Sequence, residues 1–84
     1  MNNNFSTSNF SLAQFIFSKG FALVDLDWTD SKRCQFVFVN STELLRSVEI
    51  FNFGKENDPA VMVDARELLS AGRALKDRLY QTRN

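Results

Sequence analysis

The residues best suited to chemistry in this 84-residue sequence are three aspartates close together, Asp25, Asp27 and Asp30. Alternate residues of a strand share a face, so the carboxylates of Asp25 and Asp27 could hold a hard cation between them. The sequence offers no third fixed ligand beside them, no glycine-rich phosphate loop, and no histidine to act as a base. We therefore expect a solvated hairpin end, with no metal and no acid–base role.

Cys34 is the single cysteine of the chain. It has no partner for an internal disulfide, and without histidine it cannot complete a zinc site of the usual Cys/His kind. A nucleophilic thiol needs a nearby base, which the sequence also lacks, so we interpret Cys34 as a small apolar strand residue. We predict no catalytic residue, no metal site and no cofactor, and we expect that the chain is not an enzyme.

The net charge and the hydropathy of the chain limit the classes of partner that we expect it to bind. Ten Lys and Arg residues balance ten Asp and Glu residues, so the net charge of zero gives no long-range attraction to nucleic acid or to anionic lipid. No stretch approaches the roughly 18 uninterrupted apolar residues of a membrane helix, and the N-terminus lacks the features of a secretory signal. We expect a cytoplasmic protein with no membrane partner.

The first third of the chain predicts an edge strand and a buried helix. Residues 2–4 are polar and we expect residues 1–4 to be flexible, while Phe5 begins a short edge strand. A helix follows over residues 9–19, with Ser6, Thr7, Ser8 and Asn9 all suited to cap its start and Gly20 suited to the left-handed position after its last turn. Apolar residues cover more than half of its circumference, so this helix should be buried on two sides.

Residues 21–28 and 33–39 alternate with a period of two, which predicts a β-hairpin with its turn at residues 29–32. We pair Trp28 with Arg33, and this register determines which side chains share a face. One face then holds Ala22, Val24, Leu26, Trp28, Val37 and Val39. The other holds Phe21, Leu23, Asp25, Asp27, Cys34, Phe36 and Phe38. Both faces carry apolar groups, so a helix or a second chain must also cover the second face.

Two more helices complete the chain. Asn40 and Glu43 have the spacing of a capping box, and the helix that they begin ends at Gly54. The third helix is predicted to open at Asp58-Pro59, since a cap followed by proline suits a helix start. Apolar and small residues then recur at steps of four and three and form one seam along it: Val61, Ala65, Leu68, Gly72, Leu75 and Leu79.

Gly72 and the basic end of this helix are its two unusual features. Glycine costs about 1 kcal/mol relative to alanine inside a helix, so Gly72 indicates a close backbone neighbour, either the first helix or a second copy of the chain. Arg73, Lys76 and Arg83 crowd the C-terminal half. They are explained by a solvated helix end that complements the helix dipole, or by contact with phosphate or an acidic partner.

The order of strand, helix, hairpin, helix and long helix resembles a small bacterial domain family that is known only as a domain of unknown function. The segments that carry the resemblance are Ser11-Leu12-Ala13-Gln14-Phe15, Lys19-Gly20-Phe21, Phe36-Val37-Phe38, Leu44-Leu45, Phe51-Asn52-Phe53-Gly54 and Leu75-Lys76-Asp77-Arg78-Leu79-Tyr80. The similarity runs from about Phe5 to Tyr80. It implies an architecture and no activity.

We predict a single α+β domain over residues 1–84, a small two-layer fold in which the β-hairpin, extended by the edge strand, packs against three helices. Our leading hypothesis is a non-enzymatic protein–protein interaction module, a homodimer or a partner of another protein. The candidate interface residues are Phe36, Phe38, Leu68, Gly72 and Leu75. The alternative is a nucleic-acid-associated accessory protein that makes weak anion contacts through Arg73, Lys76 and Arg83.

Overall fold

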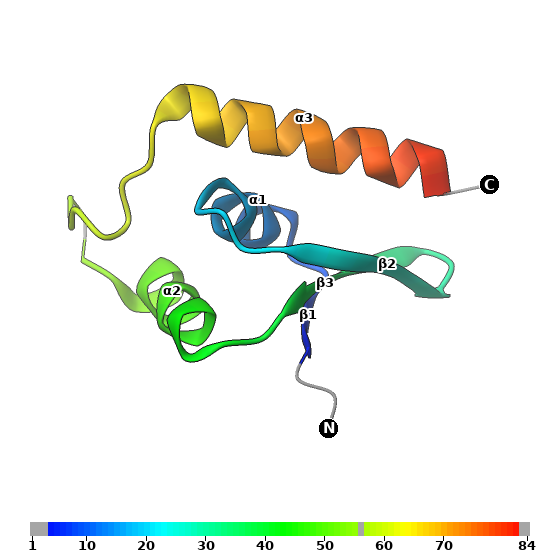
Figure 1. Ribbon diagram of the computed structural model, residues 1–84, viewed down its shortest axis with the longest axis horizontal. Coiled ribbons are helices and arrows are strands. Elements are labelled where there is room, and N and C mark those ends of the chain that lie inside the picture. Colours follow the sequence, from blue (N-terminus) through cyan, green and yellow to red (C-terminus); the bar gives the residue numbers. More distant parts are fainter. Residues whose placement is uncertain (1–3, 56, 83–84) are drawn as a thin grey trace.

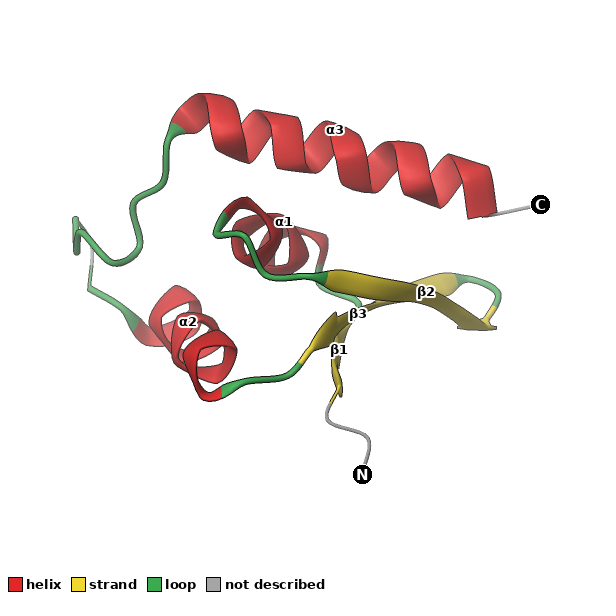
Figure 2. Cartoon of the chain, viewed as in Figure 1, coloured by secondary structure: helices red, strands yellow, loops and turns green. Residues whose placement is uncertain are grey.

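The structure is a computed structural model that describes residues 4–55 and 57–82. It contains a three-stranded antiparallel sheet in the order β1-β3-β2 and three helices (Figures 1 and 2). The elements are β1 (Asn4–Thr7), α1 (Phe10–Ser18), β2 (Leu23–Asp30), β3 (Arg33–Val39), α2 (Thr42–Phe53) and α3 (Ala65–Thr82). This arrangement confirms the predicted α+β class and the predicted order of elements.

Helix α1 lies in the middle of the fold because both of its ends are set by local signals. The Oδ1 atom of Asn9 accepts a hydrogen bond from the Leu12 N–H at 3.2 Å, and Gly20 adopts a φ of 98° just after the helix. Figure 1 shows α3 on one side of α1 and α2 on the other. The predicted helix, buried on two sides, is confirmed.

Strand β1 is an edge strand, as expected from Phe5. It pairs with β3, and Phe5 lies opposite Phe38 on the face that packs against the helices. Asn4, which we expected to belong to a flexible lead-in, is the first residue of β1. The other residues of that lead-in lie outside the described part of the chain.

The hairpin register differs from the prediction. Strand β2 contains one extra residue between Leu23 and Asp25, and the pairing also shifts between Asp27 and Asp30. Arg33 therefore lies opposite Asp30 rather than Trp28, and the turn shortens to residues 31–32. A one-residue bulge exchanges the two faces of a strand relative to its neighbour, so the predicted grouping of side chains was wrong.

The shift separates apolar from acidic side chains. Leu26 lies opposite Phe36 and packs against the core on the helix side of the sheet. Asp25 and Asp27 lie opposite Val37 and Gln35, on the other face. The two aspartates do share a face, but not the one that carries Phe36. The face of the sheet opposite the helices, which carries Asp25 and Asp27, is consequently less apolar than the sequence indicated.

Helix α2 begins one residue later than predicted. Its N-cap is Ser41, whose Oγ accepts a hydrogen bond from the Leu44 N–H at 3.0 Å, so the predicted capping box of Asn40 and Glu43 is wrong. Strand β3 continues to Val39, and a serine hydroxyl two residues further on reaches the first free amides of the helix. The helix ends before Gly54, as predicted.

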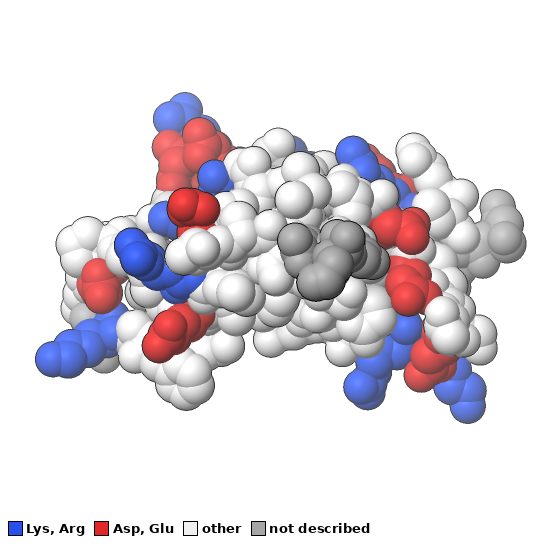
Figure 3. All heavy atoms as spheres, turned by 60° about the horizontal axis from the view of Figure 1, so that its bottom comes forward, with Lys and Arg blue, Asp and Glu red and all other residues white. Residues whose placement is uncertain are grey.

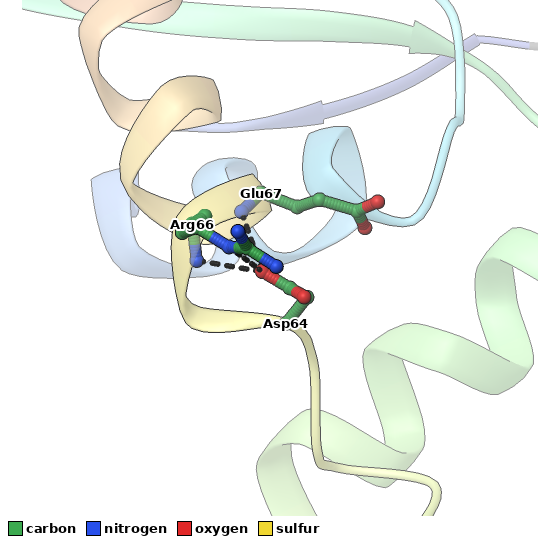
Figure 4. Close-up of polar contacts among 3 residues, drawn as sticks. All are labelled: Asp64, Arg66 and Glu67. Atoms are coloured by element: carbon green, nitrogen blue, oxygen red, sulfur yellow. Dashed lines mark hydrogen bonds and ion pairs between the residues drawn. The ribbon is translucent and has the colours of Figure 1, made fainter.

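Helix α3 begins at Ala65, not at Pro59. Asp58 organises only a turn, in which the N–H of Val61 donates to the Asp58 carbonyl at 2.9 Å. The helix is instead capped by Asp64, whose Oδ1 accepts hydrogen bonds from the N–H groups of Arg66 at 2.8 Å and Glu67 at 3.3 Å (Figure 4). The Nε atom of Arg66 lies 3.7 Å from the same oxygen.

The core lies where α1 packs against the sheet, α2 and α3. Its buried members come from α1, β3, α2 and α3: Leu12, Ala13, Phe15, Ile16, Phe36, Phe38, Leu44 and Leu75. Edge-to-face packing of Phe10 on Phe36, with ring centroids 5.9 Å apart, links the start of α1 to the sheet. In the described part of the chain, no helix combines the length and the apolar character needed to cross a bilayer.

Candidate interaction surfaces

Three of the residues predicted to form an interface lie in the core of the chain. Phe36, Phe38 and Leu75 are buried, with no more than 2% of each side chain exposed. Their apolar neighbours are the chain's own helices, so these side chains are not accessible to a partner while the domain is folded. The apolar strand face and the seam of α3 both pack against α1 within one chain.

Gly72 and Leu68 contact α1, the first of the two neighbours considered from the sequence. A Cβ atom placed on Gly72 would lie 2.6 Å from Nε2 of Gln14. The same Nε2 donates a hydrogen bond to the carbonyl of Leu68 at 2.7 Å. The glycine at position 72 therefore leaves space for this hydrogen bond between α1 and α3, which the apolar seam alone did not predict.

The predicted anion contacts lie on the exposed side of α3. Arg73 and Lys76 are exposed, and the Nζ atom of Lys76 lies 5.9 Å from the centroid of the Phe10 ring. Arg83 lies outside the described residues. Lys76 is therefore both a cation at the surface and part of the packing between α3 and the start of α1.

The aspartates of β2 are used to shape the hairpin. Oδ1 of Asp27 accepts hydrogen bonds from the side-chain hydroxyl of Thr29 at 2.5 Å and from its N–H at 2.8 Å, and these bonds lower the pKa of Asp27. Oδ1 of Asp25 accepts from the N–H of Leu26. Among residues 4–55 and 57–82, no three Asp, Glu, Cys or His side chains lie close enough to hold a metal ion.

Cys34 is buried on the helix side of β3 and makes no disulfide. Burial raises the pKa of the thiol, and the negative charges of Asp27 and Asp25 raise it further. Because the thiolate is the reactive form, this environment disfavours nucleophilic chemistry at Cys34.

A surface that the sequence reasoning missed lies at the C-terminal end of α2. Phe53 is 81% exposed there, and a hollow of about 230 Å³ beside it is lined by Arg46, Glu49, Ile50, Phe53 and Gly54. Met62, 60% exposed, follows Val61, whose Cγ2 packs against Gly54. We call Arg46, Glu49, Ile50 and Phe53 the α2 surface. An aromatic residue off the buried stripe of this helix was the signal that could have identified it.

One protein family matches the chain. The model of the family described as Domain of unknown function (DUF5659) matches residues 2–81, almost the whole chain. The chain belongs to this family, which confirms the resemblance inferred from its core and turn segments. No curated protein and no solved structure matches the chain.

Proposed function

We propose that this member of the DUF5659 family is a non-enzymatic protein-interaction module that forms a homodimer through the α2 surface. The exposure of Phe53 carries the proposal, because a Phe ring left in water loses the free energy of its burial, about 1.5–3 kcal/mol. Exposed apolar residues that stand alone are common, but Phe53 borders a hollow whose lining also includes the apolar side chain of Ile50. This grouping favours a docking surface.

The charges of the α2 surface suit contact with a second copy of itself. Arg46 and Glu49 both line the hollow beside Phe53. In the described part of the chain, the one ion pair is between Arg66 and Asp64. Arg46 and Glu49 form no ion pair there, so their charges are available to a second chain. A two-fold symmetric contact brings each patch against its own copy, where an arginine and a glutamate can pair twice.

The wider charge pattern also favours a protein partner over a polyanion on this side. Figure 3, in which the bottom of Figure 1 comes forward, shows positive and negative side chains mixed at both ends and an uncharged middle. Neither sign dominates the left end, where α2 lies. Mixed charges set register and exclude wrong partners, whereas a nucleic-acid surface concentrates cations.

A charge-swap experiment tests the homodimer. We expect Arg46→Glu and Glu49→Arg each to weaken self-association, because each puts like charges face to face across the two-fold axis. An equimolar mixture of the two variants should recover a dimer, since one chain then carries two acids and the other two bases. Lys55→Glu, a charge reversal outside the α2 surface, is the control. Failure of the mixture to associate, with the wild type dimeric, would place the interface elsewhere.

We further propose that the domain acts in the cytoplasm, where the single, buried Cys34 stays reduced. The second candidate function, a nucleic-acid-associated role for the basic side of α3, is supported by the exposure of Arg73 and Lys76. With so few cations, we expect that binding to be weak at physiological salt and to fall steeply as salt rises. A mobility-shift titration across salt, repeated with Arg73→Ala and Lys76→Ala, tests this role.

A further inference from the structure

A groove opens where the start of α1, the end of the hairpin and the last turns of α3 meet. It consists of two hollows of about 290 Å³ each, which share Phe10, Trp28 and Leu79 as walls. We call it the Trp28 groove. It lies at the opposite end of the fold from α2, as Figure 1 shows for the hairpin end and α2.

The two hollows differ in their chemistry. The first adds hydroxyl groups and two cations to the shared walls: Ser8, Ser31, Lys32 and Arg33. The second is aromatic, because Tyr80, 71% exposed, joins Phe10 and Trp28 there, with Lys76 at its rim. Among the residues that the structure describes, neither hollow has a carboxylate in its lining. The groove therefore places an anion-binding half directly beside a ring-binding half.

The nearby aspartates do not neutralise these cations from within the groove. Oδ1 of Asp27 is held by Thr29, and Oδ1 of Asp30 accepts a hydrogen bond from the backbone N–H of Lys32 at 2.9 Å. Both carboxylates are thus hydrogen-bonded to backbone N–H groups at the end of the hairpin. In the described part of the chain, no ion pair shorter than 4.0 Å involves Lys32 or Arg33.

The indole of Trp28 makes a hydrogen bond to α3 before any ligand arrives. Nε1 of Trp28 donates a hydrogen bond to Oγ1 of Thr82 at 3.1 Å, and this hydroxyl donates in turn to the Arg78 carbonyl at 2.8 Å. This hydrogen bond favours one orientation of the indole against α3. A ring held in this way offers a stacking surface at little cost in conformational entropy.

We propose that the Trp28 groove binds a nucleotide unit, with the phosphate at Lys32 and Arg33 and the planar base against the aromatic wall of Trp28 and Tyr80. A nucleotide carries a planar ring and an anion a few bonds apart, which matches two hollows that share three walls. The site is separate from the homodimer surface, and it shares Lys76, at its rim, with the basic side of α3. Its ligand is either a free nucleotide or one unit of a single strand.

Trp28 is the only tryptophan of the chain, so its fluorescence reports on the groove directly. We expect adenosine monophosphate to quench it saturably, and adenosine or inorganic phosphate alone to bind at least about tenfold more weakly, because each lacks one half of the ligand. A six-nucleotide strand of deoxyadenylate distinguishes the sources. Binding about tenfold tighter than the monophosphate indicates a single strand, and equal or weaker binding indicates a free nucleotide.

The double variant Lys32→Gln with Arg33→Gln should bind adenosine monophosphate about tenfold or more weakly than the wild type. The control variant, Lys55→Gln with Arg66→Gln, removes the same net charge outside the groove and should bind normally. Circular dichroism checks that both variants are folded. An equal loss in the control, no saturable quenching by monophosphate or strand, or tighter binding of a hexaglutamate peptide would each overturn the proposal. None of these outcomes bears on self-association through α2.

Discussion

The contact between Gly72 and Gln14 makes a quantitative prediction. Gly72→Ala should gain about 1 kcal/mol of helix propensity. The new Cβ, however, would lie 2.6 Å from Nε2 and 3.1 Å from Cδ of Gln14, so that amide must move. It would then lose its hydrogen bond to Leu68, worth about 1 kcal/mol, and crowd its neighbours at a cost of about 1 kcal/mol or more. We expect a net loss of about 1 kcal/mol.

The sign should reverse when Gln14 is removed first. In a Gln14→Ala background the amide is gone, so Gly72→Ala should stabilise the fold by about 1 kcal/mol through helix propensity alone. The difference between the two backgrounds is a coupling energy of about 2 kcal/mol. Thermal unfolding of the four proteins measures it, since 1 kcal/mol moves the Tm of a domain of this size by about 4–8 °C.

A matched cycle uses Ser70→Ala, at an exposed position on the same helix, in place of the Gly72 substitution. It should be additive with Gln14→Ala to within about 0.5 kcal/mol. The reasoning would be refuted if Gly72→Ala raised the Tm of the otherwise unchanged protein, or if the Gly72 cycle were as additive as the Ser70 cycle. Either result would mean that α1 and α3 do not approach each other at this point.

Three further predictions test the local assignments. Asp64→Ala should lower the free energy of unfolding by about 1 kcal/mol because it removes the cap of α3, whereas Asp58→Ala should cost less; chemical denaturation compares them. The pKa of Asp27 is lowered in the folded state, so its contribution is present above the unfolded pKa of about 3.9 and is lost as pH falls through the folded value. The Tm difference between wild type and Asp27→Asn should therefore shrink below about pH 4, and a gap that stays constant would contradict the assignment. Cys34 should react with a thiol reagent at least about tenfold more slowly in the folded protein than in denaturant, and equal rates would show that the thiol is exposed.

The sequence predicted correctly the helix ends that depend only on the residues next to them. Asn9 and Gly20 delimit α1 through their own backbone and side-chain preferences, and both act as expected. The start of α3 was misplaced because two aspartates compete as caps, and proline after Asp58 made the earlier one look stronger. Proline suits the first turn of a helix, but the chain forms only a turn there, and the helix begins after Asp64.

The hairpin register could not be predicted because the extra residue in β2, between Leu23 and Asp25, is marked by no glycine or proline. The burial of Phe36 and Phe38, which we predicted as interface residues, has a related cause. A strand face that carries Phe36 and Phe38 has the same pattern whether its own helices or a second chain cover it, and packing against α1 decides between them. Phe53 was overlooked because it lies off the periodic stripe of α2.

Sedimentation equilibrium tests the homodimer most directly. At tens of micromolar, we predict that the wild-type chain has twice the mass of one chain, and that Phe53→Ser has the mass of a single chain while keeping the wild-type circular dichroism spectrum. Leu69→Ser, which removes an exposed leucine from α3 outside the α2 surface, should leave the dimer intact. A wild-type protein that sediments as a single chain, or a Phe53→Ser variant that remains dimeric, would contradict the assignment of the α2 surface.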